Sequence, residues 1–247
     1  MEPNELDKGA RIQLKTLSKE NAEGVARHMV MAARHIDDDP ELAHKHALAA
    51  ARRAGRIAVV RETLAITAYA TGDFALALRE LRTYRRISGS NEQLPLMVDS
   101  ERGVGRPDRA LELGRSVPRA ELDVPVQVSL AIAMSGARLD LEQKEAALKE
   151  LEIPQLDPNR AFVWSPALFE AYATVLEELD RTDDANLWWA HAERAAAALE
   201  AAADPDGGDI VEIFEEYDTA EEDAAEEVIP EDDTDESDEQ DASTPRD

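Results

Sequence analysis

A small residue recurs at nearly even steps along this chain, and it constrains the fold more than any other feature. It is alanine in each of five copies, with steps of 34, 33, 37 and 38 residues: Ala43, Ala77, Ala110, Ala147 and Ala185. The surrounding segments carry apolar residues at helical spacing, and polar turns separate them. A small side chain where two helices cross lets their backbones approach closely. The sequence therefore predicts about five antiparallel helical pairs stacked in a row.

Residues that start and stop helices mark the bounds of these pairs. The first four helices are expected over 25–36, 40–54, 56–70 and 74–87, with glycines 55 and 72 as stops and Asp73 as a cap. Six more are expected over 92–105, 106–116, 124–140, 142–153, 165–180 and 183–202, with one longer loop over 154–164. This alternation of helices and short turns predicts an all-α protein.

The period points to a particular repeat. A helix–turn–helix unit of about 34 residues is typical of tetratricopeptide repeats. Its clearest junction is "ATGDFALALREL", residues 70–81, where Gly72 stands five residues before the alanine, as Gly105 does in the next unit. Two alternatives stay open. One is that alanine-rich helical pairs have reached a period near 34 residues by chance, and the other is that the fourth unit aligns equally well on Ala146. The prediction is a tetratricopeptide-like solenoid over 18–203, after a loosely ordered segment, 1–17, and before a disordered acidic tail, 204–247.

The charge is distributed unevenly between the middle and the end of the chain. Of the net −27, residues 204–247 hold 21 acidic residues against one arginine, whereas residues 42–120 hold 14 basic residues against 8 acidic ones. A segment so charged and so poor in apolar residues cannot bury enough surface to fold. The chain has no cysteine, no signal-like start and no apolar run of membrane length. We therefore expect a cytoplasmic protein without disulfides.

Two stretches carry a family resemblance. The segments "LAHKHALAAARRAGRIAVVRETLAITAYATGDFALALRELRTYRRISGS" and "ERGVGRPDRALEL" resemble uncharacterised tetratricopeptide-repeat-like proteins of high-GC Gram-positive bacteria, and the resemblance covers about residues 5–200. It implies a helical-repeat solenoid without a known activity. The wider tetratricopeptide family implies protein binding in the concave groove that the first helix of each pair builds.

The first helices of the first two pairs supply the candidate groove. Its predicted residues are Val25, His28, Ala32, His35, Val59, Glu62, Ile66 and Tyr69. Members of the family that hold a chaperone's C-terminal carboxylate use a clamp of Lys, Arg and Asn on these helices. The matching positions here are His28, Met29, Glu62 and Ile66, where lysine and asparagine are absent, which argues against that ligand. The largely apolar surface suits an amphipathic helix or a hydrophobic peptide. The alternative is that these residues pack against a neighbouring helix or the chain's own tail.

An arginine stripe supports a second hypothesis. Arg79, Arg82 and Arg86 are spaced three and four apart, so they share one face of a second helix. Such a face can grip RNA phosphates, which would make the protein an RNA- or ribosome-associated factor with the acidic tail as a nucleic-acid mimic. The alternative is a solvated face with local ion pairs. The tryptophans 164, 188 and 189 are expected to pack in the core rather than to form a stacking platform.

Nothing in the sequence indicates catalysis. The phosphate-binding, dinucleotide-binding and serine-hydrolase motifs are absent, and His28 and His35 stand two helical turns apart, too far to share one metal. We expect no enzyme activity, no cofactor and no metal.

The tail contains one distinct element. Apolar residues cluster among acids at Ile210, Val211, Ile213, Phe214 and Tyr217. This element is expected either to fold onto the protein's own groove or arginine stripe, or to recruit a basic partner, and the alternative is a solubilising tail. The predicted function is a non-enzymatic adaptor that binds a peptide or helix in its groove, modulated by the tail.

Overall fold

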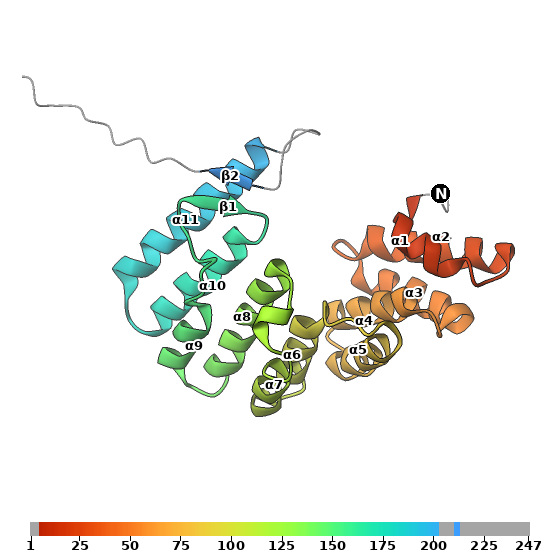
Figure 1. The fold of residues 1–247 in the computed structure, drawn as a ribbon, viewed down its shortest axis with the longest axis horizontal. Helices are drawn as coiled ribbons and strands as arrows, with labels where there is room; N and C mark the ends of the chain where they lie inside the picture. The colour runs from red at the N-terminus through yellow and green to blue at the C-terminus, as the bar shows by residue number, and fades with distance from the viewer. Residues whose placement is uncertain (1–4, 203–209, 213–247) are drawn as a thin grey trace, which may run out of the picture. The chain divides into compact units, whose positions relative to one another are not determined.

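The computed structural model describes residues 5–202 and 210–212. Five helical hairpins follow one another within it (Figure 1). They are α2–α3 (Lys19–His35 and Pro40–Ala54), α4–α5 (Ala58–Ala70 and Phe74–Ser88), α6–α7 (Leu94–Gly103 and Pro107–Gly114), α8–α9 (Val124–Leu139 and Lys144–Leu151) and α10–α11 (Ser165–Glu178 and Thr182–Ala201). A short helix, α1 (Lys8–Leu14), comes first, and a 3₁₀ turn, η2 (Arg119–Glu121), precedes α8. The two short strands are β1 (Arg160–Phe162) and β2 (Ile210–Glu212).

Four of the hairpins turn in the same way. Gly72, Gly105, Glu142 and Asp180 each have a left-handed backbone, with φ between 58° and 78°. In each turn the amide of the next residue donates to the carbonyl five residues before it at 2.9 Å, which ends the first helix. Each of these residues lies five before a repeated alanine. The chain therefore keeps one hairpin geometry even where an acidic residue replaces glycine.

The repeated alanines confirm the predicted register. All five have no exposed surface, whereas Ala146 is partly exposed beside a fully buried Ala147. The fourth unit is therefore read from Ala147. The two longer steps come from the loops between hairpins, one of which contains η2 and the other β1.

Side chains also start the helices where the sequence predicts. Asp39 accepts a hydrogen bond from the amide of Leu42 at 2.9 Å, and Asp73 accepts one from the amide of Leu76 at 3.0 Å. Both carboxylates satisfy amides that lack an intrahelical partner.

Neighbouring hairpins pack mainly through the second helix of one hairpin and the first helix of the next, and the third and fourth also through their first helices. Helix α3 contacts α4, α5 contacts α6, α6 contacts α8, and α9 contacts α10. The buried apolar side chains form clusters along this stack, and the largest lies under α8–α11.

Two short elements differ from the sequence expectations. Helix α1 lies within residues 1–17, which were expected to be loosely ordered, and it packs against both α2 and α4 through Ala10 and Leu14. The strand β2 lies within the predicted tail and pairs antiparallel with β1, with Ala161 opposite Val211. The rest of the tail, residues 203–209 and 213–247, lies outside the described residues.

Candidate partner groove

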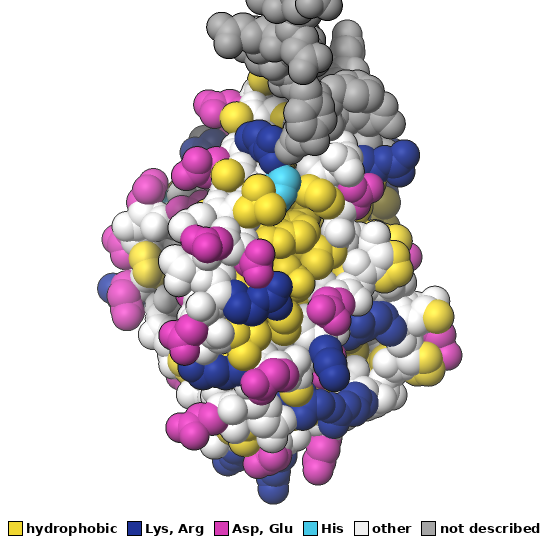
Figure 2. Space-filling view, turned by 90° about the vertical axis from the view of Figure 1, so that its left-hand side faces the viewer, with side chains coloured by type: hydrophobic (Ala, Val, Ile, Leu, Met, Phe, Trp, Pro, Cys, Tyr) yellow, Lys and Arg dark blue, Asp and Glu magenta, His cyan; other side chains and the backbone are white. Residues whose placement is uncertain are grey.

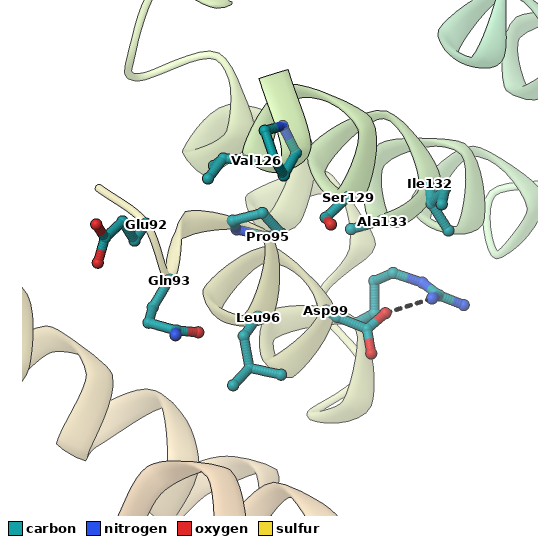
Figure 3. A pocket seen from close by; sticks show the side chains of 11 residues that line it. Glu92, Gln93, Pro95, Leu96, Asp99, Val126, Ser129, Ile132 and Ala133 are labelled. Atoms are coloured by element: carbon teal, nitrogen blue, oxygen red, sulfur yellow. Dashed lines mark hydrogen bonds and ion pairs between the residues drawn. The ribbon is translucent and has the colours of Figure 1, made fainter. Parts of the chain in front are cut away.

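The first helices line a groove that contains two adjoining cavities. We call the whole surface the partner groove. The N-terminal cavity has a volume of about 710 Å³ and lies between α1, α2 and α4, with the end of α5 at its edge. The central cavity has a volume of about 500 Å³ and lies on α6 and α8 (Figure 3). Glu92 lines both cavities, so they meet in the loop between α5 and α6.

Three of the four predicted groove residues of α4 line the N-terminal cavity. Val59, Glu62 and Ile66 are all at its wall, and Ile66 is 37% exposed. Tyr69, one turn further on, donates a short hydrogen bond to Asp99 of α6. Burial and this contact with a carboxylate raise the pKa of Tyr69 to about 12, so the phenol is neutral at physiological pH.

The predicted groove residues of α2 divide between the cavity and the core. Ala32 lines the N-terminal cavity. Val25 is fully buried in a cluster with Leu14 of α1 and does not face an open groove. His28 points to His46 of α3, and His35 is half-buried near the end of α2. The structure thus brings together only part of the predicted set.

The central cavity uses groove residues that the prediction did not include. Its wall contains Pro95, Asp99, Val126, Ser129 and Ala133. The repeat contains the signal that locates them. Residues 59, 62 and 66 shifted by 33 give 92, 95 and 99, and a further shift by 34 gives 126, 129 and 133. All six positions line the central cavity.

Two carboxylates stand where the cavities meet. Glu62 accepts a hydrogen bond from the amide of Gln93 at 2.8 Å, and Glu92 accepts one from the hydroxyl of Tyr84 at 3.2 Å. Burial raises the pKa of Glu62, the hydrogen bond from Gln93 opposes this shift, and the negative charge of Glu92 adds to it. In the part of the chain that the structure describes, neither carboxylate forms an ion pair with lysine or arginine.

The one cation of the cavity walls is already engaged. Arg102 binds Asp99 at 2.5 Å and Asp140 at 2.8 Å, and these contacts raise the pKa of its guanidinium despite burial. The groove therefore presents apolar surface and acidic groups, with no free basic group among the residues that line its cavities.

The histidines of the first hairpin form a pair. The Nδ1 atoms of His28 and His46 are 2.9 Å apart, so one ring donates and the other accepts. Burial lowers the pKa of His28, and the positive charges of His46 and Arg53 lower it further. Among the described residues, no group of three or more His, Asp or Glu side chains is arranged to hold a metal ion.

We expect this pair to make stability depend on pH. Because the pKa of folded His28 lies below its ordinary value near 6.5, the unfolded chain takes up a proton that the folded chain does not. The contribution of neutral His28 is therefore complete above about pH 6.5 and is lost as pH falls through the folded pKa. Urea unfolding followed by circular dichroism at several pH values measures this loss, with His28→Gln as the reference. If the difference in free energy of unfolding between the unchanged protein and His28→Gln stays constant from pH 7 to pH 5, His28 is not the source of the pH dependence.

The arginine stripe is largely an ion-pair surface. Arg79 binds the carboxylate of Glu80 at 3.0 Å, and Arg82 binds that of Glu101 at 2.7 Å. Both carboxylates are almost fully buried, at 3% and 4% side-chain exposure. Arg86 is exposed. Since two of the three guanidinium groups compensate buried charges of the fold, this pattern favours the solvated face over an RNA-binding stripe.

The three tryptophans pack around the last hairpin. Trp164 stacks on Phe162 of β1, with ring centroids 4.6 Å apart, and Trp188 packs edge-on against Phe169 at 5.3 Å. The indole of Trp189 donates to Glu177 at 2.9 Å. Figure 2 shows the face that carries α11, where hydrophobic side chains gather into a patch with charged side chains around it. Leu187 of this helix is 54% exposed.

Only part of the predicted tail element can be located. Residues 210–212 form β2, which lies beside β1 and α11. They are therefore not part of a helix in the groove or on the arginine stripe. Ile213, Phe214 and Tyr217 lie outside the described residues.

Comparisons with known proteins support the fold alone. No family model and no curated protein matches the chain. Among solved structures, the chain is similar to the one described as "MamA RS-1 ArsTM double mutant", with a TM-score of 0.50 and 13% identity over 72% of this chain and 98% of that chain. MamA is a tetratricopeptide-like helical-repeat protein. No described helix is both long and apolar enough to cross a membrane. The predicted kinship with high-GC bacterial proteins stays a prediction, and the chain has a tetratricopeptide-like helical-repeat fold.

Proposed function

We propose that this protein is a non-enzymatic adaptor that binds a peptide or helix of another protein in the partner groove. The observation that carries the proposal is the pair of adjoining cavities on α2, α4, α6 and α8. Together they form a largely apolar surface of a size that side chains of a bound segment can fill. We propose in addition that the acidic tail modulates this binding.

The fold supports this function in a general way. Stacked hairpins place equivalent side chains of successive first helices along one face, which builds an extended binding surface from a repeated unit. Positions 62, 95 and 129 on α4, α6 and α8 are an example, since each lines one of the two cavities.

Site-directed photo-crosslinking tests the location of the partner. A benzophenone amino acid is placed at Ile66 or Ile132 in the groove, and at Glu112 or Lys149 on the second helices α7 and α9 as controls. In an extract of the source cells, the two groove positions should crosslink to the same protein, and the two control positions should not. Adducts that form mainly from the control positions, or that nuclease removes, would show that the proposed function is wrong.

A further inference from the structure

The charged groups of the partner groove are mostly acidic. Five charged residues line its two cavities: Asp7, Glu62, Glu92, Asp99 and Arg102. Arg102 and Asp99 bind each other, and Asp7 caps α1 by accepting from the amide of Ala10 at 3.0 Å. Glu62 and Glu92 remain, and the hydrogen bonds that they accept come from neutral groups.

These two carboxylates are placed between apolar surfaces. On one side the N-terminal cavity offers Met29, Ala32 and Ile66. On the other side the central cavity offers Leu96, and its far end is marked by Ile132, opposite Glu92 and Gln93 (Figure 3). Glu62 is half-buried and Glu92 is exposed. A half-buried carboxylate without a counterion is costly, so a cation brought to Glu62 gains more than it would in water.

Helix α1 shows that a short amphipathic helix packs on these first helices. It lies against the first helices α2 and α4, and it buries Ala10 and Leu14 in that contact. Its basic side chains, Lys8 and Arg11, are exposed. A short amphipathic helix with a basic face thus already lies at one end of the groove.

We propose that the partner segment is an amphipathic helix with a lysine or arginine that reaches between Glu62 and Glu92 and apolar side chains that fill the two cavities. This inference rests on the proposed function, because it concerns the same groove. It also disfavours the acidic tail as the occupant, since residues 204–247 would bring further negative charge to these carboxylates.

Binding of three model peptides to the full chain tests the proposal. Each is a blocked helix of about 15 residues, the length that an isolated helix needs in water, built from alanine, leucine and glutamine with one central position varied. That position is lysine, glutamine or glutamate. A single charge keeps non-specific attraction to the acidic chain small. Fluorescence anisotropy of the labelled peptides measures the affinities at physiological salt.

We expect the lysine peptide to bind at least about tenfold more tightly than the glutamine peptide, as a hydrogen-bonded ion pair does. The glutamate peptide should bind most weakly. In the double variant Glu62→Gln and Glu92→Gln, the preference for lysine should disappear. The matched control Glu112→Gln and Glu193→Gln removes the same charge from exposed positions on α7 and α11, and it should keep the preference. Circular dichroism checks that both variants fold.

The outcomes separate the two proposals. If all three peptides bind alike and Ile66→Asp weakens all of them, the groove binds helices, and the inference about charge is wrong. If the control variant loses the preference as fully as the groove variant, the attraction comes from overall charge, and the inference is again wrong. If the lysine peptide does not bind, the inference is wrong, while crosslinking from Ile66 and Ile132 still decides the proposed function.

Discussion

Replacing Phe169 with alanine is expected to destabilise the last hairpin by about 3–5 kcal/mol. The ring is fully buried on α10 and contacts Trp188 of α11 edge-on. Its removal leaves a cavity within the cluster that holds α8–α11 together. Little can fill this space, because Leu168 and Leu176 beside it are themselves fully buried.

The tryptophans allow this loss to be located along the chain. All three lie between residues 164 and 189, so their fluorescence reports the last hairpin, whereas circular dichroism reports all the helices. In a repeat array, stability divides between repeats and their interfaces, so one end can unfold first. In urea, Phe169→Ala should lower the fluorescence midpoint strongly, and most of the helical signal should persist beyond it.

A matched variant at the other end gives the control. Leu81→Ala deletes a fully buried side chain of α5, which should cost about 2–5 kcal/mol. It should lower the dichroism midpoint and leave the fluorescence midpoint nearly unchanged. If both variants shift both signals equally, the array unfolds as one cooperative unit, and the expectation of a separately stable last hairpin is wrong.

The local signals of the fold could be predicted from the sequence. The cap at Asp73 and the turn at Gly72 depend on residues within one turn of helix, so the local sequence is enough to predict them. The small alanines reveal the register because only a small side chain fits at the crossing.

The elements that the sequence did not predict depend on distant contacts. Helix α1 has seven residues, too few to be stable alone, and it forms on the surface of α2 and α4. Strand β2 pairs with β1, which lies about fifty residues earlier, and three residues carry no strand pattern by themselves.

The candidate groove was predictable in outline and not in detail. Its positions on α4 followed from the repeat, and the same period applied once more reaches the central cavity on α6 and α8. The partners of the charged groups were not predictable. The sequence shows Arg79 and Arg82 as a stripe, and only the packing of α5 against its neighbours shows that Glu80 and Glu101 are buried beneath it.

The buried carboxylates also explain how the hairpins are joined. Arg82 of α5 binds Glu101 of α6, and Arg102 of α6 binds Asp140 at the end of α8, so ion pairs link the second hairpin to the third and the third to the fourth. Buried ion pairs contribute little net stability, but removing one partner is costly because the other charge stays buried.

The ion pair inside the second hairpin should show this most strongly. Arg61 of α4 binds Glu80 of α5 at 2.5 Å and also donates to the carbonyl of Gly55 at 2.5 Å. We expect Arg61→Met to lower the free energy of unfolding by about 3–5 kcal/mol, because Glu80 then stays buried with only Arg79, whose side chain is 71% exposed. Urea unfolding followed by circular dichroism measures the loss, and tryptophan fluorescence should change little.

Removing both charges together should recover most of this loss. In the double variant Arg61→Met and Glu80→Leu, apolar side chains of similar size replace the pair, and such replacements are often neutral or stabilising. Arg109→Met, at an exposed arginine of α7, controls for the loss of one positive charge and should change stability by less than about 0.5 kcal/mol. If Arg61→Met is as stable as this control, the charge of Glu80 is compensated without Arg61, and the expected loss of stability is wrong. If the double variant is no more stable than Arg61→Met, the cost comes from the lost contact with Gly55 and not from the unpaired carboxylate.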